Sequence, residues 1–77
     1  MAGHETLNIW TIYDNPTDFP GKFVARRFVV YGATGPLATP EVFEADTLEE
    51  VRAMIPQGLF RMEPWQGDDI KIVETWI

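Results

Sequence analysis

Only one stretch of this sequence has helical periodicity, and that stretch is too short to be stable without a sheet beneath it. Leu48, Val51 and Ile55 recur at the i, i+3 and i+7 positions of a helix, and Met54 widens the apolar stripe. Pro56, with the Gln-Gly pair that follows it, ends the pattern after about three turns. Isolated helices shorter than about 12 residues are marginal in water. We therefore expect this helix to pack on a sheet.

The start of the helix carries a capping signal. Thr47 and Glu50 have the spacing of a capping box. In that motif the Thr47 hydroxyl accepts a hydrogen bond from the Glu50 amide, and the Glu50 carboxylate accepts one from the Thr47 amide. We therefore predict that the helix begins directly after Thr47.

Two segments before the helix are typical of β-strands. Residues 7–13 are rich in aromatic and β-branched side chains, carry large apolar groups on both faces, and precede a turn cluster at residues 14–16. Residues 23–31 alternate between two faces. Alternation places Val24, Phe28 and Val30 on one face and Phe23, Ala25, Val29 and Tyr31 on the other. It also points Arg26 and Arg27 to opposite sides of the sheet.

Three weaker segments complete the pattern. Residues 32–40 hold several glycines and prolines and predict a loop, after which residues 41–45 form a short strand. Residues 59–65 and 70–77 flank a turn and predict a closing hairpin. Pro64 indicates that the first strand of this hairpin lies at an edge or ends early.

The predicted order is β-β-β-α-β-β. This is an α+β fold in which an antiparallel sheet of four to five strands carries one helix on one face. The strand order stays open, and the crossing through the helix permits one parallel pair. We expect a single domain over residues 1–77, with residues 1–6 as a flexible tail.

Charge and composition exclude several classes of protein. The chain has no cysteine and a single histidine, so stabilisation by disulfide bonds or by a structural zinc site is excluded. No apolar run approaches the roughly 20 residues of a membrane helix, and residues 1–6 lack the basic and apolar blocks of a secretory leader. We therefore expect no membrane partner and a cytoplasmic location. The net charge of −6 argues against tight binding of nucleic acid, which depends on Lys and Arg.

Residues that could carry catalysis are scarce. The chain has no serine and no cysteine, and His4 lies in the expected tail, where nothing holds a general base in place. Asp68 and Asp69, with Glu63 and Glu74, could supply oxygen ligands to a metal. Their spacing matches no metal-binding loop motif, so an ordinary turn is favoured. We expect no enzyme activity, no cofactor and no metal.

The only cluster of basic and aromatic residues lies in and just before the second strand. Proteins that bind single strands combine phosphate contacts with stacking platforms in this way. Binding of single-stranded nucleic acid through residues 22–31 is therefore the alternative function, with Lys22, Arg26 and Arg27 as its contacts. The competing interpretation pairs these cations with the acids of the second half of the chain.

The favoured function is protein binding without catalysis. The excess negative charge lies in residues 41–77, and an acidic face can occupy the basic groove of a nucleic-acid-binding protein. A core this small cannot bury three Trp residues completely, and exposed Trp rings are frequent binding hot spots. The predicted protein-binding residues are Glu44, Asp46, Glu49, Glu50, Trp65 and Trp76. Self-association through an edge strand is the other form that this function could take.

Four segments carry a resemblance to other proteins. Residues 10–16 (WTIYDNP), 18–20 (DFP), 23–27 (FVARR) and 72–77 (IVETWI) resemble small uncharacterised proteins of proteobacteria and their phages. The likeness spans nearly the whole chain and implies a bacterial or phage origin, but no activity. Small acidic phage proteins include inhibitors of host nucleic-acid-binding enzymes, such as anti-CRISPR proteins. Size and charge alone suggest a role of this kind here.

Overall fold

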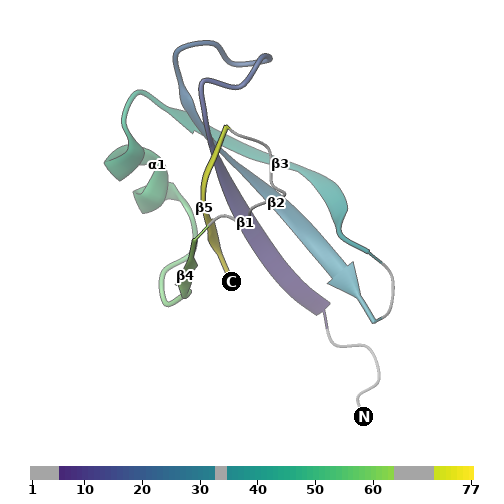
Figure 1. Ribbon diagram of the computed structural model, residues 1–77. Coiled ribbons are helices and arrows are strands. Elements are labelled where there is room, and N and C mark those ends of the chain that lie inside the picture. Colours follow the sequence, from purple (N-terminus) through teal and green to yellow (C-terminus); the bar gives the residue numbers. More distant parts are fainter. Residues whose placement is uncertain (1–5, 33–34, 64–70) are drawn as a thin grey trace.

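The structure, a computed structural model, describes residues 6–32, 35–63 and 71–77. Within these residues, five strands and one helix follow one another in the predicted order (Figure 1). They are β1 (Thr6–Asp14), β2 (Phe23–Tyr31), β3 (Leu37–Ala45), α1 (Leu48–Met54), β4 (Arg61–Met62) and β5 (Ile72–Trp76). The α+β class and the order β-β-β-α-β-β are confirmed.

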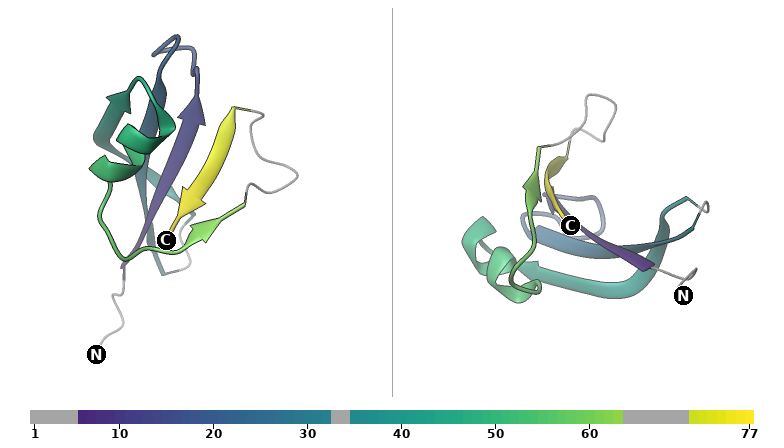
Figure 2. Two further views of the ribbon diagram at one scale, coloured as in Figure 1. Left: turned by 90° about the vertical axis from the view of Figure 1, so that its left-hand side faces the viewer. Right: turned by 90° about the horizontal axis from the view of Figure 1, so that it is seen from below.

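The five strands form one sheet in the order β3-β2-β1-β5-β4. Every pair of neighbouring strands is antiparallel, so no parallel pair forms among the described strands. The chain leaves α1 into β4, an edge strand, and β5 then returns beside the central strand β1. Figure 2 shows α1 against one side of this sheet. We call that side the helix face and the opposite side the open face.

The third strand is longer than predicted. β3 begins at Leu37, not at residue 41, and runs through Pro40, which was expected to lie in a loop. A bulge opposite Arg27 accommodates this proline, because a bulged residue does not have to donate to the ladder. The Thr39 hydroxyl donates to the Arg27 carbonyl at 3.0 Å and accepts from the Glu41 amide at 3.2 Å. These bonds satisfy backbone groups around the bulge.

The helix begins where the capping signal predicted. The Thr47 hydroxyl accepts from the Glu50 amide at 3.1 Å. The Glu50 carboxylate accepts from the Thr47 hydroxyl at 3.0 Å, so the expected bond to the Thr47 amide is replaced. Val51 is buried, whereas Met54 is 46% exposed and does not widen the packed stripe. Leu48, Val51 and Ile55 share one side of the helix, and Met54 lies at the margin of that side, away from the sheet.

The core lies between α1 and the helix face. Its buried members are Trp10, Ile12, Ala25, Val51 and Ile55. The Trp10 indole stacks on the Phe43 ring of β3 with 5.3 Å between the ring centroids. Trp76 packs against the same core from β5. One helix and one sheet face therefore account for most of the buried apolar side chains.

The closing hairpin is shorter than predicted. β4 comprises two residues, so residues 59, 60 and 63 of the expected strand 59–65 lie outside it, and β4 is an edge strand as expected. Phe60 and Ile77 exchange backbone hydrogen bonds of 2.7 and 3.0 Å just before β4. The predicted turn lies in residues 64–70, outside the described residues.

A shift of register in β5 decides which of its side chains face the core. Ile12 lies opposite Glu74, but Tyr13 lies opposite Ile72, so Val73 is the extra residue. Glu74 and Trp76 face the helix because they lie opposite Ile12 and Trp10, and the shift turns Ile72 to the open face. The register with β1 thereby places a carboxylate inside the core.

Four hydrogen bonds satisfy this buried carboxylate. Glu74 accepts from Arg52 of α1 at 2.8 and 2.6 Å, from Arg61 of β4 at 3.1 Å, and from the Trp76 indole at 2.5 Å. Its side chain is completely buried, whereas the two arginines are partly exposed. The Arg52 bonds hold the pKa of Glu74 down at about 2, although burial opposes them. Glu74 therefore joins the helix, β5 and β4 through one ionised group.

Replacing Glu74 by glutamine should lower the free energy of unfolding by about 2–3 kcal/mol, because the arginines lose the charge that binds them. Glu63→Gln is the matched control, since Glu63 also pairs with Arg61 but its side chain is 74% exposed. That control should cost less than about 0.5 kcal/mol. Urea denaturation of both variants measures the difference. Equal losses would contradict a special role for Glu74.

The contribution of Glu74 to the free energy of unfolding should also depend on pH, over one limited pH range. The pKa of Glu74 is lowered from 4.5 to about 2 by folding, so the stabilisation is complete above the unfolded pKa and is lost as the pH falls from about 4.5 towards 2. We expect the stability difference between the wild-type protein and Glu74→Gln to be constant above about pH 5.5 and to shrink below about pH 4.5. Urea titrations at several pH values test this. A difference that grows on acidification would contradict it.

Candidate interaction surfaces

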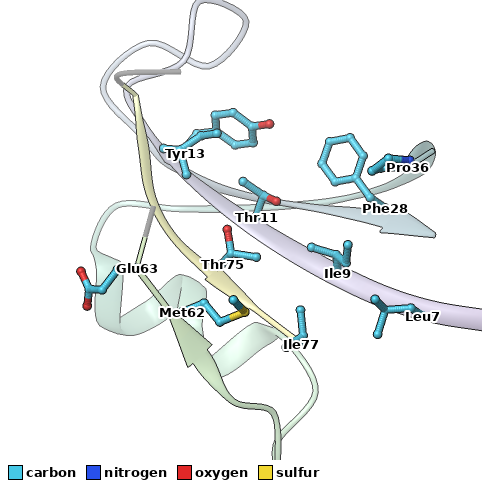
Figure 3. A pocket seen from close by; sticks show the side chains of 11 residues that line it. Leu7, Ile9, Thr11, Tyr13, Phe28, Pro36, Met62, Glu63, Thr75 and Ile77 are labelled. Atoms are coloured by element: carbon cyan, nitrogen blue, oxygen red, sulfur yellow. The ribbon is translucent and has the colours of Figure 1, made fainter. Parts of the chain in front are cut away.

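The open face is hollowed, and none of the described elements covers it. Side chains from four strands surround a groove of about 660 Å³. Figure 3 shows Phe28 and Pro36 on one wall and Met62 and Ile77 on the other, with Ile9 between them. The described residues that line the groove are Leu7, Ile9, Thr11, Tyr13, Phe28, Pro36, Met62, Glu63, Ile72, Thr75 and Ile77.

The chemistry of this groove favours apolar contacts. Glu63 is the only charged side chain among the described lining residues. Thr11 and Thr75 lie opposite each other in the β1–β5 ladder and supply the hydroxyl groups of the floor. The volume falls within the range of about 300–1,000 Å³ that ligand pockets occupy. The described lining residues are mostly apolar, so the groove is suited to binding an apolar surface.

The groove is apolar because both sides of β1 are apolar while a single helix covers only one of them. Trp10 and Ile12 face α1, and the intervening side chains face away from it. Leu7 is 48% exposed and Met62 37% exposed. Phe60, which strand alternation places on the same side as Met62, is 77% exposed. Large apolar side chains therefore meet solvent on the open face.

One end of the open face is closed by the connection between β1 and β2. The Arg26 guanidinium lies 6.0 Å from the Tyr13 ring centroid and 5.9 Å from that of Phe19, and it pairs with Asp18. Val24, on the same face as Arg26, is fully buried. The exposed part of the open face therefore begins beyond Tyr13 and continues towards Leu7.

The three cations predicted as nucleic-acid contacts do not share a surface. Lys22 pairs with Asp46, whose hydrogen bond and charge raise the pKa of Lys22. Arg26 lies on the open face, whereas Arg27 lies on the helix face, as alternation predicted. Arg27 donates to Asn8 Oδ1 at 3.0 and 2.6 Å and to Glu41 at 2.5 Å. Every one of these cations already has a carboxylate partner.

Some of the acids predicted as a protein-binding face already make contacts within the chain. Asp46 pairs with Lys22, and Glu50 belongs to the helix cap. Glu44 lies opposite Val24 and so points to the open face, whereas Glu49 lies in the first turn of α1. These four residues are near one another in the chain, but they do not form one flat patch.

Two of the three tryptophans can be placed. Trp10 is buried, and Trp76 is half-buried with its indole bound to Glu74. The partly exposed Trp76 ring therefore serves the core, and its predicted role at a protein interface stays a prediction. Trp65 lies outside the described residues.

No group of three His, Cys, Asp or Glu side chains in residues 6–32, 35–63 and 71–77 lies close enough to hold a metal ion. Glu74, considered as a possible ligand from its sequence position, is enclosed by Arg52 and Arg61. Asp68, Asp69 and His4 lie outside the described residues. The helix in the described part of the chain is too short to cross a bilayer.

Sequence reasoning did not single out the open face as a site. Its signal was present, because residues 7–13 carry large apolar groups on both faces. One short helix can cover only one face of a sheet. Combining these two observations would have predicted a bare apolar face. Pro36 and Ile72 could not have been assigned to it, since each depends on a bulge.

The comparisons with known proteins add no relative. No protein-family model, no curated protein and no solved structure matches this chain. The expected bacterial or phage origin therefore stays a prediction, and the candidate surfaces depend on their own chemistry.

An apolar groove that is open to solvent should bind an environment-sensitive dye in the native state. We expect the fluorescence of anilinonaphthalene sulfonate to rise on adding the folded protein, and Phe28→Ala to lower this signal by roughly half or more. Met54→Ala, on the exposed side of α1, is the control and should leave the signal unchanged. A signal that depends on Met54 and not on Phe28 would place the apolar site elsewhere.

Proposed function

We propose that this protein is a non-enzymatic protein-binding domain and that the open face of its sheet is the binding surface. The observation that carries the proposal is the bare apolar groove between β2 and β4. Monomeric proteins rarely leave a large contiguous apolar surface in water unless it has a binding role. A protein surface is the partner class that best matches a wide, open groove with few polar groups.

The open face supports this function better than the acidic residues near α1 do. Asp46 and Glu50 are engaged within the chain. Exposed charge pairs contribute little to affinity, whereas apolar and aromatic side chains at the centre of an interface contribute most. Phe28, Met62 and Ile77 are side chains of this second kind. The acids at the edge would then set salt dependence and association rate.

The geometry does not favour the alternative of single-stranded nucleic acid. A strand-binding surface needs cations and stacking rings on one side of the molecule. Arg26 and Arg27 point to opposite faces, and Lys22, Arg26 and Arg27 all pair with carboxylates. Inhibition of a host nucleic-acid-binding enzyme stays the biological role that size and charge predict.

Capture from a proteobacterial lysate, with and without nuclease treatment, tests the proposal when four forms of the tagged protein are compared. Phe28→Ala should weaken a stoichiometric protein complex by about thirtyfold, the equivalent of a hot-spot loss of about 2 kcal/mol. Met54→Ala is the matched control, because it removes an exposed apolar side chain from α1, away from the open face. Glu49→Lys tests the acidic surface. Circular dichroism checks that each variant is folded.

The outcomes separate the candidate surfaces. Loss of the partner with Phe28→Ala, and retention with Met54→Ala and Glu49→Lys, supports the open face. Loss with Glu49→Lys and retention with Phe28→Ala overturns it in favour of the acidic residues. Recovery of nucleic acid that the nuclease removes, with affinity falling steeply as salt rises, supports the alternative function.

A further inference from the structure

Part of the sheet projects beyond both α1 and β5. β5 pairs with β1 only from Trp10 to Tyr13, whereas β2 pairs with β1 from Thr6 onwards. Figure 1 shows β1 and β2 continuing past the end of β5. We call the projecting part the neutral arm and define it as residues 6–9 of β1, 28–31 of β2 and 37–38 of β3.

The neutral arm is apolar on both faces. Leu7 is 48% exposed on the open face, and Tyr31 is 51% and Leu37 47% exposed on the helix face, beyond the helix. Phe28 lines the adjoining groove. Three of the six large exposed hydrophobic side chains of the described chain therefore gather on a few residues of three strands.

The backbone of the neutral arm also has an unpaired edge. Among the described residues, positions 6–9 of β1 pair with β2 on one side only, because β5 does not reach them. Ile77, the residue after β5, exchanges its backbone bonds with Phe60 on the other side. An unpaired edge of this kind is a template for another strand.

The two outer edges of the sheet are protected in ways that this edge is not. β3 carries Pro40, a bulge and the charged Glu41 and Glu44, all of which discourage strand addition. β4 is two residues long. Residues 6–9 (TLNI) contain no charge, no proline and no bulge.

The absence of charged residues from the neutral arm indicates which kind of partner surface can bind it. Neither residues 6–13 nor residues 28–40 contain an Asp, Glu, Lys or Arg, although each chain carries a net charge of −6. A basic partner would find no counter-charge on the neutral arm. A second copy presents an equally neutral and apolar surface, and its acids lie outside that contact.

We propose that a second copy of this chain covers the neutral arm, through antiparallel pairing of residues 6–9 of β1 with the same residues of the other copy. The two sheets then join across a two-fold axis, as in most symmetric dimers. This inference rests on the proposed function, since it names the first partner of this protein-binding domain.

The paired edge is short, because residues 6–9 span roughly 13 Å of strand. The exposed Leu7 side chain stands on this edge and adds an apolar contact to the backbone pairing. The small core gives a further reason for association, because chains of this size without disulfides often gain stability from it.

Sedimentation analysis over a range of protein concentrations tests the dimer. We expect a monomer–dimer equilibrium that tightens as salt rises, since salt screens the repulsion between two acidic chains. Leu7→Glu should raise the dissociation constant by about a hundredfold or more, because a two-fold contact contains the new charge twice. Met54→Glu is the matched control: a side chain of similar exposure, 46%, receives the same charge away from the neutral arm, and its dimer should persist.

Amide hydrogen exchange of the wild-type protein supplies a readout that needs no substitution. Exchange at residues 6–9 should slow by about tenfold or more when the concentration rises through the dissociation constant. A wild-type protein that stays monomeric, or a dimer that survives Leu7→Glu and is lost in Met54→Glu, overturns the inference. Unchanged exchange at residues 6–9 in a dimeric sample overturns it as well.

These results are separable from failure of the proposed function. If the wild-type protein is monomeric but Phe28→Ala still releases a captured partner, the second copy is wrong and the open face remains a protein-binding surface. If the dimer forms through residues 6–9 and no other protein depends on Phe28, the inference stands and the open face is not the binding surface that the proposed function assigns.

Discussion

The buried ion network around Glu74 is the interaction on which the rest of this structure depends. One carboxylate on β5 binds Arg52 of the helix and Arg61 of β4, and it also accepts from the Trp76 indole. A helix of seven residues and a strand of two have little packing of their own. Their attachment to a single ionised group fixes where both lie on the sheet. The low pKa of Glu74 shows that these contacts stabilise the ionised carboxylate in the folded protein.

That attachment also determines what the molecule leaves uncovered. Because α1 packs on β2 and β3 and reaches Glu74 of β5 through Arg52, it covers the half of the helix face that contains Trp10 and Ile12. The open face and the neutral arm receive no cover from the described elements, although both carry large apolar side chains. In the proposed function, a bound protein surface covers these apolar side chains.

Local patterns predicted most of the fold and little of the site. The capping signal at Thr47 and the alternation in residues 23–31 depend on neighbours in the chain, so the sequence alone located α1 and β2 correctly. The start of β3 at Leu37 and the outward direction of Ile72 depend on bulges, and the inward direction of Glu74 depends on the register with β1; the partner strand sets all three. The pairing of the predicted acids and cations with one another is a tertiary property that local patterns do not show. It left Lys22, Arg26 and Asp46 already engaged.

The most direct test of the account is an amide map of the contact surface by nuclear magnetic resonance, recorded on isotope-labelled protein across a concentration series. Shifts or broadening confined to Leu7, Ile9, Phe28 and their strand neighbours, with residues 48–54 of the helix unchanged, are the result that a contact through the open face and the neutral arm predicts. Changes centred on Glu49 and its neighbours in α1, or a spectrum that does not respond to concentration or to a captured partner, would contradict it.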